Sequence, residues 1–281
     1  LAVIIPPSIP MILYGVTTQT SIPELFIAGF GPGILIGGSL IATVLIWCRV
    51  KGWGKEDGVG RLSFPVATRQ AGFALLMPFV VLGGIYGGVT TPTEASVIAV
   101  VYALLIGLFV HKEIAWRDLF PIFKKSVISS AVIMFIIACA AVFSWLLNRQ
   151  GVPDLAAEWI ATSFDSSSLY LLVVNLFLFV VGMFVETSAS IIVLAPILAE
   201  AAEKLGIDQV HFGTIMVVNL ALGMITPPFG VNLFAAAQVA RCGVDQMMRY
   251  LWVFIAVVFG ALMVITYLPW ITLTLPQLVF R

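Results

Sequence analysis

The chain has 281 residues, of which 61% are hydrophobic and only 10% charged, and its 14 basic residues balance its 14 acidic ones. Soluble domains are about half apolar and about a quarter charged, so this composition excludes an ordinary soluble protein and indicates a polytopic α-helical membrane protein. The basic residues are scattered without an aromatic–basic motif, so nothing in the sequence suggests nucleic-acid binding. The cysteines, Cys48, Cys139 and Cys242, share no metal or redox spacing, and we expect them to be small buried residues.

Apolar runs predict the membrane spans. In chain order they are residues 1–18, 22–48, 70–88, 93–110, 126–147, the long region 169–205, then 210–240 and 250–270. Prolines 6 and 7 interrupt the first run, and the sequence VETSAS splits the region 169–205. Residues 111–126 mix Trp116 and two lysines with apolar residues, which predicts an amphipathic helix lying in the membrane interface.

Lysine and arginine are distributed unevenly between the two sides of these spans. If the linker after Cys48 is cytoplasmic, only Arg149, Lys204 and Arg281 fall outside. The eleven inside residues are Arg49, Lys51, Lys55, Arg61, Arg69, Lys112, Arg117, Lys124, Lys125, Arg241 and Arg249. Basic residues are retained on the cytoplasmic side, so this skew predicts the orientation and an outer C-terminus.

The region 169–205 must leave from and return to the outer side. It is either two spans with VETSAS at the cytoplasmic face or a re-entrant hairpin with that tip buried. The tip contains no Gly, Pro, Lys or Arg, which makes a poor solvent-exposed turn and favours the hairpin. Because Leu1 already lies in a hydrophobic segment without a signal-peptide n-region, we expect the sequence to be part of a larger subunit.

The two proline pairs, Pro6-Pro7 and Pro227-Pro228, lie 221 residues apart in similar apolar surroundings. By the predicted orientation their helices cross the membrane in opposite directions. Paired broken helices of this kind are typical of inverted-repeat transporters, in which they mark a binding site near the membrane midplane. The alternative is that both prolines serve helix packing alone.

A proline pair removes backbone donors and thereby predicts unpaired carbonyls. Pro227 and Pro228 should leave the carbonyls of Gly223 and Met224 without partners. Unpaired carbonyls in lipid need protein, water or a cation, and the half-helix after the break starts with free N–H groups suited to a carboxylate. One break can therefore serve a cation and an anion together.

The chain resembles the large membrane subunit of TRAP (tripartite ATP-independent periplasmic) transporters. The resemblance rests on IIPPSIPMILYGV, GGIYGGVTTPTEAS, VYALLIG, IIVLAPIL and HFGTIMVVNLALGMITPPFGVNLF, which together run over nearly the whole chain. It implies an elevator-type, sodium-coupled symporter of the bacterial inner membrane with two re-entrant hairpins, no organic cofactor and no enzymatic activity. The implied partners are a small four-helix membrane subunit, a periplasmic substrate-binding protein and the upstream N-terminal part of the large subunit.

The resemblance also implies which residues hold ions and substrate. Residues 184–190 would form the tip of the outer hairpin, 226–230 the break that faces it, and 5–9 the break facing an inner hairpin upstream of Leu1. The implied sodium ligands are Glu186, Thr187, Gly223, Thr226, Pro227 and Gly230 on the outer side and Ile5 and Pro6 on the inner side. The implied substrate contacts are Pro7, Ser8, Ser188, Ser190 and Asn232.

Several of these residues have a second interpretation. Glu186 is the only acid deep in an apolar run, which suggests a sodium site, but it could equally cap the second hairpin arm. The hydroxyls at the tip could do the same, and Asn219 and Asn232 could serve helix–helix hydrogen bonding. Glu94 lies in a TPTE capping box, and His111 and His211 have no metal-binding spacing, so structural roles are expected for these three.

The expected domains are a broken helix of the first transport repeat (1–20), scaffold helices with an amphipathic arm (21–125), a second transport repeat (126–243, with hairpin 168–206 and broken helix 208–240) and a C-terminal helix (244–281). No basic residue lies deep in a predicted span, so sodium and helix dipoles would neutralise an organic anion. Sialic acid is the first substrate expected and a C4-dicarboxylate the next. The alternative function is a passive small-anion channel or exporter.

Overall fold

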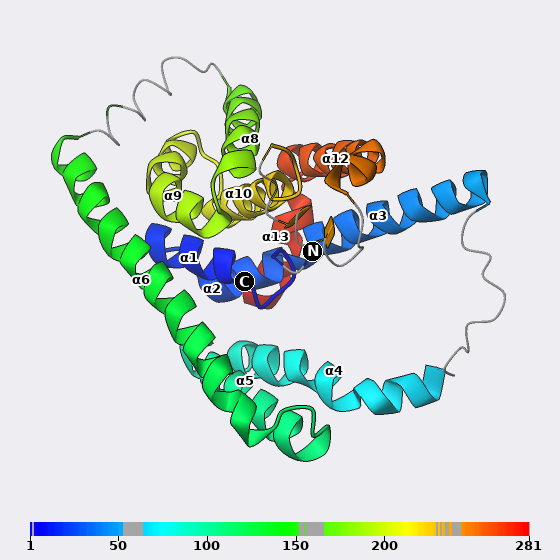
Figure 1. The fold of residues 1–281 in the computed structure, drawn as a ribbon. Helices are drawn as coiled ribbons and strands as arrows, with labels where there is room; N and C mark the ends of the chain where they lie inside the picture. Colours follow the sequence, from blue (N-terminus) through cyan, green and yellow to red (C-terminus); the bar gives the residue numbers. More distant parts are fainter. Residues whose placement is uncertain are drawn as a thin grey trace. The chain divides into compact units, whose positions relative to one another are not determined.

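The computed structural model describes residues 1, 3–52, 64–151, 155, 166–228, 230, 232–233, 236–237 and 243–280. Every regular element in these residues is a helix, which confirms the predicted all-α class (Figure 1). Segments long and apolar enough to cross a bilayer are Ile22–Lys51, Pro92–Val110, Trp116–Cys139, Ser167–Phe184 and Asp245–Tyr267. The chain is therefore a polytopic α-helical membrane protein. Lys55, Arg61, Arg241, Cys242 and Arg281, which contributed to the predictions above, lie outside the described residues.

The chain divides into two compact units, one made of Leu1–Trp47 with Ile136–Arg281 and the other of Cys48–Phe135. The first unit is built around α10 (Gln209–Gly223), which is buried along almost its whole length. Helices α8 (Ser167–Phe184), α9 (Thr187–Lys204), α12 (Val244–Tyr267) and α1 (Ile9–Thr18) pack around it (Figure 1). A helix buried on all sides accounts for an apolar sequence without an amphipathic stripe.

The predicted span 22–48 consists of two helices, α2 (Ile22–Ala28) and α3 (Phe30–Lys51), that meet at Gly29. A Cβ at Gly29 would lie 2.4 Å from the carbonyl oxygen of Ile4, and one at Gly33 would lie 2.8 Å from the side chain of Ile5. The first proline break therefore packs directly on the junction of α2 and α3. Only glycine leaves room for this approach.

The expected C-terminal helix 244–281 is also two helices. Helix α12 ends at Tyr267, before Pro269, and a further helix, α13 (Trp270–Phe280), packs on α2. A Cβ at Gly31 would lie 2.0 Å from the carbonyl oxygen of Ile271, so the backbones of α3 and α13 touch there. Helix α13 was not predicted, because its 11 residues are too few for a span and follow an apolar run without a polar interruption.

In the second unit, α4 (Phe64–Tyr86) and α5 (Pro92–Leu105) pack against each other. The Tyr102 hydroxyl of α5 donates to the carbonyl of Phe73 in α4 (2.7 Å) and so links the two helices. The predicted capping box is confirmed, because Thr91 and Glu94 exchange hydrogen bonds between side chain and backbone at the start of α5. Most apolar residues of this unit are exposed, as expected for helices that face lipid.

Residues 111–126 do not form the separate helix that was predicted, while their position in the membrane interface stays a prediction. Residues 111–115 are not helical, a 3-10 turn η2 covers Trp116–Asp118, and α6 (Leu119–Arg149) begins there and continues through residue 126 without a break. The positive φ of Lys112 prevents the helix that ends at Val110 from continuing, and the Asp118 carboxylate, which accepts from the N–H of Ala115 (2.9 Å), caps the start of η2. The expected burial of Cys48 and Cys139 is also wrong, because they lie half-buried and exposed on α3 and α6.

Candidate functional site

Glu186 caps α9, which is the second arm of the predicted hairpin 168–206. Helix α8 ends at Phe184, Val185 is extended, and Glu186 is the N-cap of α9. Its carboxylate accepts hydrogen bonds from the N–H groups of Ser188 (2.8 Å) and Ala189 (3.1 Å) and from the Ser188 hydroxyl (2.9 Å). The capping interpretation of Glu186 is therefore correct, and both carboxylate oxygens are occupied; its role toward sodium stays a prediction.

The side-chain hydroxyl of Thr187, at the tip, is buried and has no hydrogen-bond partner among the described residues. The residue is 1% exposed, and its hydroxyl makes no hydrogen bond to any described residue. Ser190 is also buried, but its hydroxyl donates to the carbonyl of Glu186 (3.0 Å). A buried hydroxyl oxygen without a partner is uncommon and expensive, so Thr187 is the tip residue best suited to contact a ligand.

The second break follows α10, and the carbonyls predicted to be unpaired there are in fact satisfied. The N–H of Thr226 donates to the carbonyl of Gly223 (2.9 Å), and the N–H of Asn232 donates to the carbonyl of Met224 (3.2 Å). The chain folds back after the prolines, so that the N–H of Asn232, eight residues after Met224, replaces the N–H that Pro228 lacks. Thr226 is 1% exposed and its hydroxyl donates to the carbonyl of Leu222 (2.9 Å).

The first break has the same hydrogen-bonding arrangement. At the offset of 221 residues, Leu1 corresponds to Leu222, Val3 to Met224 and Pro6 to Pro227. The carbonyl of Leu1 accepts from the N–H of Ile4 (2.9 Å), as that of Leu222 accepts from Ile225 (3.2 Å). The carbonyl of Val3 accepts from the Ser8 hydroxyl, so its donor also lies beyond the prolines.

These local likenesses support an internal repeat, while the opposite crossing of the two breaks stays a prediction. Both Pro-Pro peptide bonds are cis. Ser8 is buried and is the N-cap of α1, while Pro6 is buried and Ile5 and Pro7 are exposed.

Two glycines bring the hairpin and the second break together. A Cβ at Gly223 would lie 2.4 Å from the carbonyl carbon of Gly182, so the backbones of α8 and α10 touch at this crossing. Gly182 lies within one turn of the tip at Phe184, and Gly223 within one turn of Thr226. The tip and the break therefore lie next to each other. Gly230 is buried in the described part of the break, whereas Asn232 is exposed.

A buried polar network lies beside this crossing. Asn219 of α10 donates through Nδ2 to the Asn175 Oδ1 (2.6 Å) and backbone carbonyl (2.9 Å) on α8, and Asn175 donates to the Thr266 hydroxyl of α12 (3.0 Å). His211 contacts the Thr272 hydroxyl (2.7 Å) and the Thr266 carbonyl (3.2 Å). The expected structural role of His211 fits these contacts. Sequence reasoning did not single out Asn175, Thr266 or Thr272, although a polar residue within an apolar helix is a usable signal.

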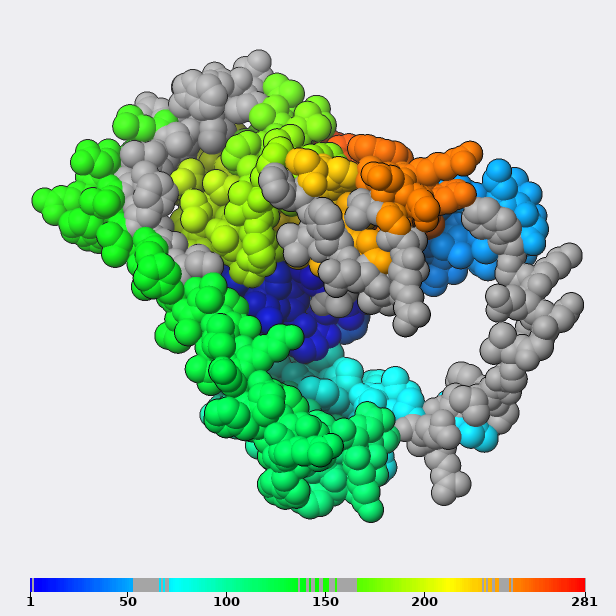
Figure 2. Space-filling model, in the orientation of Figure 1, coloured from blue at the N-terminus to red at the C-terminus, as the bar shows by residue number. Residues whose placement is uncertain are grey.

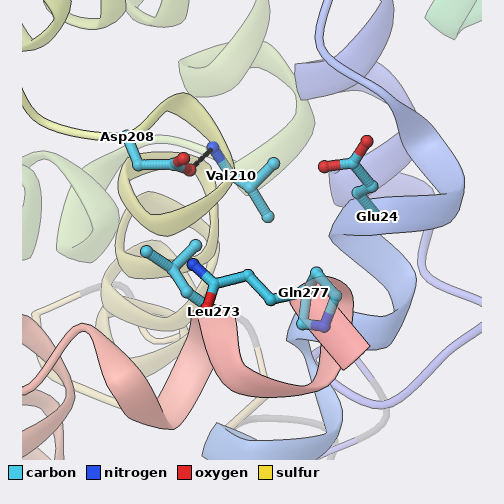
Figure 3. A pocket seen from close by; sticks show the side chains of 6 residues that line it. Glu24, Asp208, Val210, Leu273 and Gln277 are labelled. Carbon is cyan, nitrogen blue, oxygen red and sulfur yellow. Dashed lines mark hydrogen bonds between the residues drawn. The ribbon is translucent and has the colours of Figure 1, made fainter. Parts of the chain in front are cut away.

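Near this network, Glu24, Asp208 and Gln277 line a small pocket with three other residues (Figure 3). The Asp208 carboxylate already accepts from the N–H groups of Val210 (2.8 Å) and His211 (3.2 Å). Among the described residues no group of three or more His, Cys, Asp or Glu side chains is placed to hold a metal ion. The Asp208 carboxylate in this pocket is therefore engaged as the N-cap of α10.

Known proteins resemble the chain over almost its full length. Residues 1–271 match the family model of the tripartite ATP-independent periplasmic transporter, DctM component. The C4-dicarboxylate TRAP transporter large permease protein DctM of Pseudomonas aeruginosa is 40% identical over 99% of the chain and 65% of its own length. The isethionate TRAP transporter permease protein DctMQ of Oleidesulfovibrio alaskensis is 39% identical over 96% of the chain and 42% of its own length.

The sialic acid TRAP transporter large permease protein SiaM of Vibrio cholerae is 33% identical over 98% of the chain and 64% of its own length. The chain thus spans less than two thirds of each of these three relatives. The match to the family model and these identities together show that the chain belongs to the DctM component family of TRAP transporters.

Proposed function

We propose that the chain is part of the large permease subunit of a TRAP transporter that imports an organic acid together with sodium. In this proposal a periplasmic binding protein delivers the substrate, and a small membrane subunit accompanies the permease. The family membership supports the permease role. The geometry of the hairpin and the second break supports the ion site.

The observation that carries the ion site is the unpaired, buried hydroxyl of Thr187 beside the second break. Sodium is a hard cation that binds oxygen ligands. In this proposal the unpaired Thr187 oxygen binds sodium together with the second lone pairs of the Thr226 hydroxyl and of the break carbonyls, and the contact of Gly182 with Gly223 brings the tip to the break. Glu186 contributes its negative charge nearby while its oxygens cap α9.

The other predicted contacts keep the roles given by the resemblance. Gly223, Pro227 and Gly230 belong to the outer sodium site, and Ile5 and Pro6 to the inner one. Pro7, Ser8, Ser188, Ser190 and Asn232 are proposed to face the substrate.

The substrate is proposed to be a small organic anion. Relatives are named for C4-dicarboxylate, isethionate and sialic acid, all of which carry an acidic group. The three relatives named for C4-dicarboxylate are 35%, 36% and 40% identical to the chain, and the one named for sialic acid is 33% identical. Succinate and sialic acid should therefore be tested side by side.

The proposed movement is that of one compact unit as a rigid body. Residues 1–47 and 136–281 contain both breaks, the hairpin and the helices packed on them. The first part of α3 moves with this body in our proposal, because Gly31 meets the backbone of α13 and Gly33 meets the Ile5 side chain of the first break. The unit 48–135 would then supply scaffold helices.

The test is uptake of labelled succinate or sialic acid into proteoliposomes that contain the full-length permease and its small subunit, with binding protein outside. Thr187→Val removes the free hydroxyl at almost unchanged volume and should raise the sodium concentration for half-maximal uptake about tenfold or more, a loss equivalent to about 1.4 kcal/mol. Thr187→Ser should restore the wild-type value. Thr214→Val is the matched control, since the buried Thr214 hydroxyl donates within its own helix to Val210 (2.8 Å).

Two outcomes would contradict the proposal in different ways. An unchanged sodium dependence in Thr187→Val would remove this residue from the ion site while leaving the transport function intact. Uptake that needs neither a sodium gradient nor binding protein would instead favour the passive channel or exporter.

A further inference from the structure

Residues 106–125 of the second unit form a compact bend between two membrane-spanning helices. The π-helical turn η1 (Ile106–Val110) ends α5, and the chain then reverses through residues 111–115 into η2 and α6. The N–H of Ile114 donates back to the carbonyl of Gly107 (3.3 Å), and a Cβ at Gly107 would lie 2.5 Å from the Ile114 side chain. The bend is thus held by its own contacts. We call it the cationic elbow.

Aromatic residues on the elbow are exposed together. The rings of Phe109 and Trp116 meet edge to face with centroids 6.3 Å apart, although Phe109 is 58% and Trp116 70% exposed. Phe120, in the first turn of α6, is 76% exposed. Exposed aromatic rings next to the end of a span are typical of the level of lipid headgroups.

The basic residues of the elbow outnumber its acidic ones. Lys112, Arg117, Lys124 and Lys125 are all exposed, and the acidic residues are Glu113 and Asp118. The Asp118 carboxylate is engaged as a cap on Ala115 and lies 3.8 Å from the Arg117 guanidinium. The lysine side chains are therefore the cations most available to an outside anion.

The first turns of α6 separate charge from apolar surface. By helical spacing, Lys124 and Lys125 lie on the side of the helix opposite Leu119, Ile122 and Phe123. Ile122 and Phe123 are 45% and 46% exposed, and Figure 2 shows this part of α6 at the surface. Phe120 lies one turn before Lys124 on the same side, so that an exposed ring borders the lysines. A helix start with apolar residues on one side, and lysines beside an aromatic ring on the other, fits the boundary between acyl chains and headgroups.

We propose that the cationic elbow binds the phosphate headgroup of an anionic phospholipid. Its exposed lysines complement the negative charge of such a lipid, and Trp116 with Phe109 and Phe120 would lie against the upper acyl chains. The distribution of basic residues predicts that the elbow lies on the cytoplasmic side, where anionic lipid attracts clusters next to a span. This site is separate from the ion and substrate sites and does not depend on them.

The experiment is native mass spectrometry of the full-length permease complex, released from micelles with equal amounts of phosphatidylglycerol and phosphatidylcholine. The variant Lys124→Gln with Lys125→Gln should retain less phosphatidylglycerol, by about fivefold for each charge removed. Lys124→Arg with Lys125→Arg should retain it as the wild type does. The matched control, Arg49→Gln with Lys51→Gln, removes two exposed basic residues near the end of α3 that are also predicted to be cytoplasmic.

Equal loss of phosphatidylglycerol in the control and elbow variants would overturn the proposal, because attraction would then be spread over all basic residues. Unchanged retention in the elbow variant would overturn it as well. Inorganic phosphate that displaces the lipid from the elbow would identify an anion site rather than a lipid site. Thermal unfolding in phosphatidylcholine alone checks that the elbow variants are folded, and sodium-dependent uptake shows separately whether transport persists.

Discussion

Gly182 and Gly223 place the backbones of two helices in direct contact, with no side chain between them. The Cα of Gly223 would lie 3.2 Å from a Cβ at Gly182, and the reverse substitution would bring a Cβ to 2.4 Å from the carbonyl carbon of Gly182. Small residues permit such approaches in membrane proteins, where packing and hydrogen bonds rather than water exclusion hold helices together. This contact determines how closely the hairpin tip lies against the second break.

Gly223→Ala should therefore destabilise the protein by about 1–3 kcal/mol, because the added methyl group meets backbone that cannot rotate away. The measurement is the thermal unfolding of the purified permease complex. The matched control is Gly260→Ala in α12, where a Cβ would meet nothing within 4 Å. Alanine there should stabilise its helix by about 0.5–1 kcal/mol. Equal thermal transitions for the two variants would show that the crossing tolerates a side chain.

The N-cap at the hairpin tip gives a second prediction. Glu186→Ala should weaken the first turn of α9 by about 1 kcal/mol, since the N–H groups of Ser188 and Ala189 lose their acceptor. Glu186→Asn retains a capping oxygen and should recover most of this loss. Hydrogen exchange at the amides of residues 188 and 189 is the measurement. If Glu186→Ala leaves their protection unchanged, the cap contributes nothing to the stability of the tip.

Local patterns predicted the parts of the fold that depend on neighbouring residues. The helix start at Thr91–Glu94 follows from a four-residue motif, and the interruptions at Pro6 and Pro227 follow from the missing N–H of proline. The resemblance of the two breaks was visible as a constant offset in sequence. These features need no knowledge of distant packing.

Features that depend on the path of the chain were missed. Met224 was predicted to have an unpaired carbonyl, but its donor is Asn232, whose position depends on how the segment turns after the prolines. The sequence pointed to Asn219 but not to its partner Asn175, which lies 44 residues away on another helix. Glu186 had two interpretations, and only the geometry of Ser188 and Ala189 distinguished them.

A contact between α1 and α10 gives the third prediction. The Tyr14 ring lies over Gly213, where a Cβ would come within 2.3 Å of it, and the Tyr14 hydroxyl bonds to the backbone carbonyl (3.1 Å) and side-chain oxygen (3.0 Å) of Gln209. Gly213→Ala should lower the thermal transition by the equivalent of about 1–3 kcal/mol. Combining it with Tyr14→Leu should remove the clash, so the double variant should be more stable than the sum of the single changes indicates. Simple additivity would show that the ring moves aside without cost.

The paired amides of Asn175 and Asn219 give the last prediction, and a double-mutant cycle tests it. Both residues are completely buried, and the Asn219 Nδ2 donates to two oxygens of Asn175.

Asn219→Leu should destabilise the complex by about 1–3 kcal/mol, because the Asn175 Oδ1 then stays buried without a donor. Asn175→Leu should do the same and also deprives the Thr266 hydroxyl of a donor. Changing both residues to leucine removes the Asn175 Oδ1 and the Asn219 amide together and leaves only the Thr266 hydroxyl without its donor, so its effect should be smaller than the sum by about 0.5 kcal/mol or more. Denaturant unfolding in mixed micelles measures the three free energies, and Thr214→Val, which breaks only a bond within α10, serves as the near-neutral reference. A coupling energy of zero would mean that each asparagine finds other partners when its neighbour is removed, and the pair would then not join α8 to α10.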